Sequence, residues 1–212
     1  MKRIVLFVAV CLAFVSCGVP VAEEEAKESA IPALNASPAD FELWEVANLH
    51  EQLSAINDYI VNQLSSSVLV NIEDTAAVNR LFEQAYRNGS LDPGVAHHAW
   101  LYHSPLEEAG QCELLFIGGS NALLDGTHVT MARQDFDRSN GYTVALKFDE
   151  EGTAQLAKIT NEYLGKMLAI VVKGEVIAMP AISSEITNGR MSISANFSQA
   201  DAQAIAAIFD KE

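Results

Sequence analysis

Basic residues are scarce in this sequence. Its 212 residues include 13 Lys and Arg against 28 Asp and Glu, which gives a formal net charge of −15. A surface of this sign repels phosphate backbones, so nucleic-acid binding is not expected. Cysteine is scarce too, because three residues are too few for a fold held together by disulfides. Hydrophobic residues make up 50% of the chain and charged residues only 19%, which excludes a chain that is disordered throughout.

The N-terminal segment has the pattern of an export signal. Lys2 and Arg3 precede an apolar run from Ile4 to Val15, which is shorter than the roughly 20 residues that cross a bilayer as a helix. The run ends at Ser16-Cys17, and a small residue followed by Cys at this place resembles the lipobox of a bacterial lipoprotein. We therefore expect residues 1–16 to be a lipoprotein signal peptide and Cys17 to be lipidated. The alternative is an ordinary secretory signal that leaves Cys17 as a thiol.

This interpretation places the chain in the cell envelope, as a membrane-anchored lipoprotein facing the periplasm. Cys11 would leave with the signal and Cys17 would carry lipid, so Cys112 would have no intramolecular disulfide partner. Beyond residue 15 no apolar stretch reaches spanning length. Residues 17–39 carry several prolines and the acidic cluster Glu23 to Glu25 without a hydrophobic period, which is typical of a flexible acidic linker. An acidic tail that binds a partner is the alternative.

Residues 40–120 alternate between strand-like and helical patterns, which predicts a base-like α+β subdomain. One strand is expected over Phe41 to Val46. Apolar residues then recur at helical steps of three and four: Leu49, Leu53, Ile56, Ile60 and Leu64. A second helix is expected between a cap at Asp74 and a stop at Asn88-Gly89. Three further strands are predicted, over Ser67 to Ile72, Ala99 to Tyr102 and Cys112 to Ile117.

Residues 121–212 show the same alternation of strand-like and helical patterns, which predicts a second α+β subdomain. Apolar residues at every second position predict one strand over Tyr142 to Phe148 and another over Met191 to Phe197. Asp149 and Ser198 occupy positions typical of helix caps. Lys173-Gly174 separates two apolar runs and predicts a tight hairpin, because Gly accepts positive φ without strain. The predicted fold class is therefore α+β, with two small α/β-layer subdomains.

Two stretches carry a pattern that is specific in its spacing. They read Gly-Lys-x-Leu-Ala-Ile-Val-Val-x-Gly-x-Val-Ile-Ala-x-Pro over residues 165–180 and Ile-Thr-x-Gly-Arg-x-Ser-Ile-Ser-x-Asn-Phe over residues 186–197. Together with Ala132 to Asp137 and Ala202 to Ile208, they resemble the first periplasmic domain of the SecD/SecDF protein-export family, and the second subdomain resembles its head. The resemblance continues more weakly from Phe41. Ala195 and Met179 depart from the smaller residues that are usual in the family at these places.

The resemblance implies a module that contacts exported polypeptides or an export or assembly complex in the membrane. The family's transmembrane helices have no counterpart in these 212 residues, so transport itself is not implied. We expect a stand-alone lipoprotein that binds polypeptides or partner proteins and is linked to protein export. The alternative is a structural or regulatory docking subunit of a membrane complex that touches no substrate.

No pattern in the sequence points to catalysis, a cofactor or a metal. On a strand over residues 97–103, His97 and His103 would lie about 20 Å apart at 3.3 Å per residue, and His98 would face the other way. Cys112 alternates with apolar neighbours and is expected to be a buried, inert thiol. The Gly118 to Ala122 segment lacks the arrangement of a nucleophile elbow. We therefore expect no enzyme activity, no cofactor and no metal site.

Methionine and tryptophan side chains are the candidates for contacting apolar polypeptide segments, because Met adapts its shape and aromatic rings offer a broad contact area. The candidates are Trp44, Trp100, Met167, Met179 and Met191. Met179 and Met191 are the predicted peptide-binding pair, since both fall on neighbouring segments of the head-like region. We also expect a free strand edge nearby that could pair with an extended peptide. Ordinary core or rim positions are the alternative for each of these residues.

Overall fold

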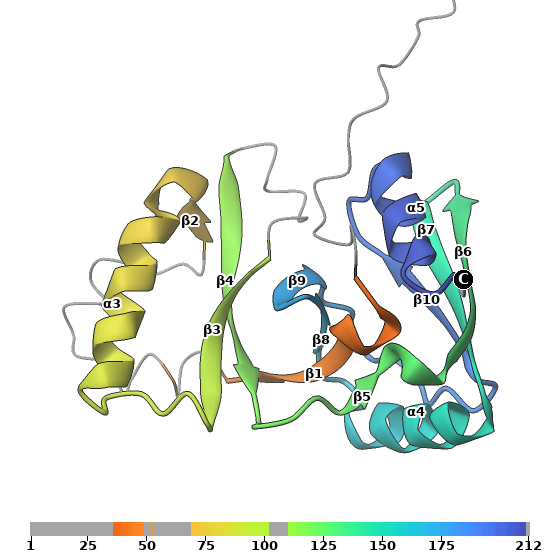
Figure 1. Ribbon diagram of the computed structural model, residues 1–212, viewed down its shortest axis with the longest axis horizontal. Coiled ribbons are helices and arrows are strands. Elements are labelled where there is room, and N and C mark those ends of the chain that lie inside the picture. Colours follow the sequence, from red (N-terminus) through yellow and green to blue (C-terminus); the bar gives the residue numbers. More distant parts are fainter. Residues whose placement is uncertain (1–35, 49–51, 53–68, 102–109, 211–212) are drawn as a thin grey trace, which may run out of the picture.

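The computed structural model describes residues 36–48, 52, 69–101 and 110–210, and within them the chain forms two β-sheets with helices packed against them (Figure 1). The predicted α+β class is confirmed. The predicted signal peptide, nearly all of the linker and the helix expected over residues 49–64, apart from Gln52, lie outside the described residues. No helix within the described ranges has the length and apolar character needed to cross a membrane.

The larger sheet has seven strands in the order β2-β4-β3-β9-β8-β1-β5. In chain order these are β1 (Phe41–Ala47), β2 (Leu69–Asn71), β3 (Ala96–Leu101), β4 (Gln111–Gly118), β5 (Leu124–Asp125), β8 (Leu168–Val172) and β9 (Glu175–Ala178). Each strand predicted from the sequence in this region overlaps an observed strand, although β3 begins three residues before the predicted start. All described pairings are antiparallel except β3 with β9.

One strand closes this sheet on itself. The first part of β1 pairs with β8 over Phe41 to Glu45, and its last part pairs with β4 over Glu45 to Ala47. Strands β4, β3, β9, β8 and β1 therefore form a ring. Alternate residues of its strands share an apolar cluster, called here the ring interior: Ala99, Leu101, Leu115, Ile117, Ala169, Val171 and Val176. Side chains alternate between the two faces of a strand, so every second residue points into the ring. These residues are apolar, and their side chains fill the ring interior.

One outer face of the ring is covered by α3 (Thr75–Arg87), which follows the short helix η2 (Ile72–Asp74). The helix buries Val78, Phe82 and Ala85 as its helical period predicts. It ends at Asn88 as expected, and Gly89 adopts φ +77°, a value that glycine accepts readily. Asp74 occupies the N-cap position but makes no capping hydrogen bond through its side chain.

The smaller sheet has the order β10-β7-β6, from β6 (Val129–Asp137), β7 (Gly141–Phe148) and β10 (Arg190–Ser194). The short helices η1 (Pro38–Asp40) and η4 (Gly126–His128) precede β1 and β6. Helix α4 (Glu150–Glu162) starts at Asp149, whose carboxylate accepts from the Gly152 N–H. Helix α5 (Gln199–Ala207) starts with the predicted capping box of Ser198 and Asp201 and packs against β6 and β7.

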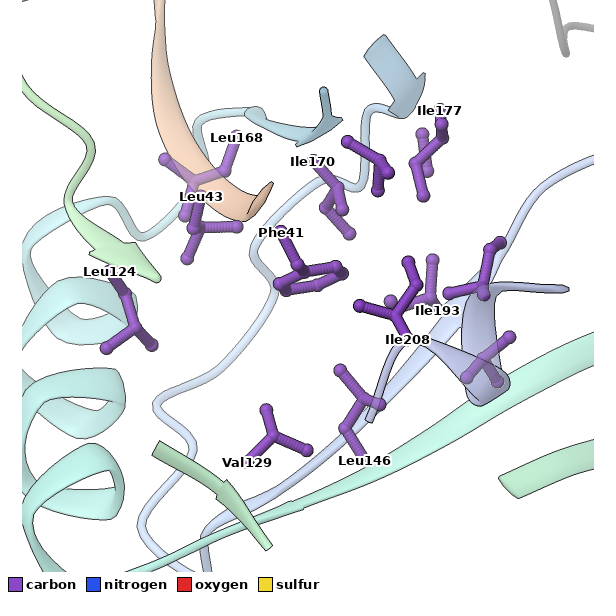
Figure 2. Close-up of a cluster of buried hydrophobic side chains, with 14 of the residues drawn as sticks. Phe41, Leu43, Leu124, Val129, Leu146, Leu168, Ile170, Ile177, Ile193 and Ile208 are labelled. Carbon is purple, nitrogen blue, oxygen red and sulfur yellow. The ribbon is translucent and has the colours of Figure 1, made fainter. Parts of the chain in front are cut away.

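A shared core joins the two sheets. Figure 2 shows Phe41 of β1 between Leu43 and Leu168 on one side and Ile193 of β10 and Ile208 after α5 on the other, and all belong to one buried cluster. Lys173 and Gly174 adopt φ values of +51° and +83°, so the predicted tight hairpin between β8 and β9 is confirmed. That hairpin comes from the second predicted subdomain, yet it lies in the same sheet as β1, β3 and β4. The hydrogen-bonded sheet therefore crosses the boundary expected at residue 120.

Candidate functional site

Residues 179–189, called here the crossing loop, connect β9 of the larger sheet to β10 of the smaller one. Its first part is fixed next to the end of α4 by three backbone hydrogen bonds. Leu168 donates to Pro180 at 3.1 Å, Ile182 donates to Lys166 at 2.8 Å, and Gly165 donates to Ile182 at 2.8 Å. These bonds surround an isolated bridge between Met167 and Ala181. The loop thus leaves the larger sheet in a defined direction.

Two further contacts fix the rest of the crossing loop. The Ile186 N–H donates to the hydroxyl oxygen of Thr160 on α4 at 2.9 Å. The Gly189 carbonyl accepts from the Phe148 N–H at 2.9 Å. Gly189 has φ +63° and lies against Thr153, where an added Cβ would overlap the threonine hydroxyl. Only glycine fits both the backbone conformation and this close approach.

The crossing loop covers a cavity of about 170 Å³. Its apolar floor comes from β1, β8 and α4, and the rim comes from the crossing loop and β10. The lining residues are Leu43, Leu156, Thr160, Leu168, Ile170, Pro180, Ala181, Ile182, Ser183, Ser184, Ile186, Arg190, Met191 and Ser192. An engineered apolar cavity of about 150 Å³ holds a benzene molecule, so this space suits one large apolar side chain.

A side-chain hydrogen bond connects the end of α4 to β1 beside the floor. Tyr163, just after α4, donates its O–H to the Glu45 carboxylate at 3.0 Å. Burial raises the pKa of Tyr163 to about 12, and the Glu45 carboxylate acts in the same direction. The phenol therefore keeps its proton and remains a donor at neutral pH.

An edge strand borders the cavity. Among the described residues β10 pairs only with β7, so the other side of β10 has no strand partner in this part of the chain. Met191 and Ser192 of β10 both line the cavity. An extended peptide that paired with β10 would bring alternate side chains to the mouth of an apolar space.

The structure does not bring the two predicted methionines together. Met191 is half-buried, packs against the core that joins the sheets and lines the cavity. Met179 is half-buried against the ring interior and is not among the cavity-lining residues. The cause is topological, because Met179 follows β9 in the larger sheet whereas Met191 lies on β10 in the smaller one. Proximity in the sequence pattern did not imply a shared site.

The other candidate residues have separate environments. Trp44 packs against the ring interior, and Trp100 is buried under α3. Met167 is 48% exposed beside the start of β8. Thr160, Gly189 and Arg190 were not singled out from the sequence as site residues. Thr160 adjoins the buried helical stripe of α4, which is the one signal that could have indicated it.

The histidines do not converge. His97 has an edge-to-face contact with Trp44, whereas His98 stacks on Phe82 of α3, so the two rings lie on opposite faces of β3. His103 lies outside the described residues. Cys112 is buried as predicted, and its thiol donates to the Val70 carbonyl at 3.6 Å. No group of three or more His, Cys, Asp or Glu side chains able to hold a metal lies in the described ranges.

Comparison with known proteins gives the family. The model described as "SecDF, P1 head subdomain" matches residues 104–211, so the chain belongs to this family. The chain is 35% identical over 86 residues to Protein translocase subunit SecD of Magnetococcus marinus, covering 41% of this chain and 16% of that protein. The SecD of Rhodothermus marinus is 30% identical over 136 residues, which cover 64% of this chain and 22% of that protein. The chain thus spans 16% and 22% of these relatives' lengths.

The chain also matches a solved structure titled "Crystal structure of SecDF in Super-membrane-facing form". The match covers 90% of this chain and 30% of the solved chain, with 18% identity and a TM-score of 0.43. The resemblance of the second half to the SecD head is confirmed by the family match.

Proposed function

We propose that this chain is an extracytoplasmic module that binds extended polypeptide segments during protein export. Its relatives are named protein translocase subunits, which supports a client that is itself a polypeptide. The single observation that carries the proposal is the edge position of β10, which has no second strand partner among the described residues, beside the apolar cavity. The proposed activity is binding rather than catalysis.

The chemistry of this site suits clients of diverse sequence. Main-chain pairing with β10 uses groups that every peptide has, so it tolerates changes of client sequence. The cavity adds a preference for one apolar side chain, and its burial contributes about 25 cal/mol per Å² of apolar surface. Met191 at the rim adapts to side chains of different shapes.

We propose further that residues 1–16 are removed, that lipidated Cys17 anchors the chain, and that residues 17–39 form the tether. The charged N-terminus, the short apolar run and the Ser16-Cys17 junction support this arrangement. A tether of this kind raises the effective concentration of the binding module near a membrane complex. The folded part would then act at the periplasmic face of an export or assembly complex.

The test is a titration of the full chain with an uncharged, unfolded peptide that contains one Leu, followed by NMR. Shifts are expected at Met191, Ser192 and Ile186. Met191→Asp should weaken binding because it places a charge at the rim of the apolar cavity. Met131→Asp is the matched control, since Met131 is 54% exposed on β6, the opposite edge of the same sheet.

Two results would count against the proposal. One is equal binding by the wild type and a folded Met191→Asp variant. The other is a set of shifts centred on α3 and Trp100, on the far side of the ring. Met191→Ala should bind with intermediate affinity, which separates lost packing from the introduced charge.

A further inference from the structure

The outer face of the smaller sheet is a regular grid of side chains that none of the described residues covers with a helix. Cross-strand pairing fixes three rows across β6, β7 and β10, and α5 packs on the other face. The rows are Met131, Lys147 and Arg190; Arg133, Ala145 and Ser192; and Asp135, Thr143 and Ser194. Three basic side chains, Lys147, Arg190 and Arg133, lie in two adjacent rows, although the chain has 28 acidic and only 13 basic residues.

Two of these cations lie directly opposite each other. Lys147 and Arg190 are paired in register, and both are exposed. Like charges in this position destabilise a sheet, because their Cβ atoms lie about 5 Å apart. Arg133 donates to Asp135 at 3.1 Å, but no ion pair in the described part of the chain includes Lys147 or Arg190. Their repulsion would be relieved by an anion bound between or above them.

Arg190 is among the residues that line the cavity, and its exposed side chain faces the outer side of the sheet, so this positive charge lies beside the proposed peptide site. Resting on the function proposed above, we propose that the site selects segments in which an acidic residue is immediately next to the apolar residue that enters the cavity. The carboxylate would be held by the Arg190 guanidinium, with Lys147 adding positive potential beside it. The ligand class is therefore an extended peptide that carries an apolar-acidic pair.

The spacing follows from the alternation of side chains along strands. The side chain of Met191 packs against the core on the inner side of the sheet, whereas the side chains of Arg190 and Ser192 face the outer side. All three residues border the cavity, which lies at this edge of the sheet. A client residue opposite Met191 would point inward, and its immediate neighbours would point outward, toward Arg190 on one side and Ser192 on the other. Client residues two positions away would again face inward. A client carboxylate therefore reaches Arg190 only from a residue next to the apolar residue that enters the cavity. The direction of the client strand decides whether this acidic residue precedes or follows the apolar one.

Guanidinium and carboxylate form a charge-assisted pair that is about twice as strong as a neutral hydrogen bond. Because both partners are exposed, the selectivity should weaken as salt screens the charges. The apolar contribution of the cavity should persist. Salt dependence thus separates the two parts of recognition.

The experiment compares three labelled peptides that contain one Leu in an otherwise uncharged extended sequence, with binding to the full chain measured by fluorescence anisotropy. The first has Gln on both sides of Leu, the second has Glu there, and the third has Glu two residues away on both sides. The second peptide should bind about tenfold more tightly than the first at an ionic strength of about 0.05 M. The advantage should shrink at about 0.5 M. The third peptide should gain much less than the second.

Arg190→Gln should abolish the preference for Glu, and Lys147→Gln should reduce it. Arg138→Gln is the matched control, because Arg138 is exposed in the turn between β6 and β7, away from the cavity-lining residues. Equal binding of the first two peptides by the wild type overturns the inference but leaves the proposed function intact. A preference that survives in Arg190→Gln overturns it as well. If none of the peptides binds the wild type, the proposed function itself fails, and this inference with it.

Discussion

Thr160 on α4 accepts a hydrogen bond from the backbone N–H of Ile186, and the two atoms are 2.9 Å apart. The same hydroxyl donates to the Leu156 carbonyl one turn earlier, at 2.7 Å. Thr160 is 1% exposed. One buried hydroxyl therefore holds the middle of the crossing loop above the cavity.

Thr160→Val should loosen the crossing loop and destabilise the fold. Valine keeps the shape of threonine but leaves the Ile186 N–H without its acceptor, which costs about 1–3 kcal/mol when the site stays buried. Hydrogen exchange should show faster exchange of the Ile186 amide. Thr160→Ser keeps the hydroxyl and should retain most of the protection. Unchanged exchange in the valine variant would mean that the backbone hydrogen bonds of Pro180 and Ile182 already fix the loop.

Gly189→Ala should be more harmful than Gly174→Ala, although both glycines have positive φ. At Gly174 an added Cβ meets nothing within 4 Å, so this variant measures only the cost of the left-handed backbone, about 1–2 kcal/mol. At Gly189 the Cβ would also overlap the Thr153 hydroxyl. The free energies of unfolding in urea should therefore differ. Thr153→Ala combined with Gly189→Ala should recover part of that difference. If the two substitutions instead change the free energy of unfolding additively, the proposed overlap is contradicted.

A second polar network fixes α3 to β3. The Tyr86 hydroxyl accepts from the His98 backbone N–H at 2.7 Å and lies 3.0 Å from the His98 Nδ1. Asn79 Oδ1 lies 2.8 Å from the Trp100 indole nitrogen and 2.9 Å from the His98 Nε2. The indole N–H can only donate, so this Asn79 atom is an acceptor, and the His98 Nε2 must carry the proton. Tyr86 then donates to Nδ1, and the neutral ring satisfies every bond.

Acidification should weaken this contact. Burial lowers the pKa of His98 from 6.5 to about 4, and the nearby His97 acts in the same direction. The folded pKa lies below the unfolded one, so the unfolded chain takes up protons first as the pH falls. The contribution of His98 to stability is fully present above about pH 6.5, declines between 6.5 and 4, and changes no further below that range.

Urea unfolding across this range should show a smaller loss of stability with falling pH in His98→Gln than in the wild type. Ring-nitrogen NMR should show a neutral His98 with protonated Nε2 at pH 6. The other titratable groups at the network are Tyr86, whose pKa is raised by burial, and His97, whose pKa is lowered by burial. A His98 ring that titrates near 6.5 would contradict the proposed environment.

Local features of this fold could be predicted because their causes lie within a few residues. Asp149 caps α4, Ser198 and Asp201 form a capping box, and Lys173-Gly174 turns a hairpin, each through a short-range conformational preference. The alternation in β7 likewise indicated which of its faces is buried. In these elements the local pattern and the tertiary structure agree.

The site could be predicted only in part, because it depends on pairing between distant segments. Nothing near Met179 in the sequence indicates that β9 pairs with β3, more than 70 residues earlier, and this pairing turns Met179 toward the ring interior. Arg190 is significant only because β10 places it opposite Lys147 and beside the cavity. The open edge of β10 matches the type of edge expected near the hairpin, but it belongs to the other sheet.

Lipidation at Cys17 is the prediction that decides where the proposed binding module acts. Lys2, Arg3 and the apolar run to Val15 match a short export signal, and Ser16-Cys17 follows at the expected distance. The intact mass of membrane-extracted protein should equal residues 17–212 plus acyl groups, because signal removal makes the modified cysteine the new N-terminus. Cys17→Ala should abolish the acyl mass and release the protein into the soluble fraction, since one residual apolar run of this length does not span a bilayer. Cys112→Ala is the matched control and should stay with the membrane, because that thiol is buried in the fold. A mature N-terminus elsewhere, without added acyl mass, would instead favour the ordinary secretory signal and would leave the peptide site without its proposed tether.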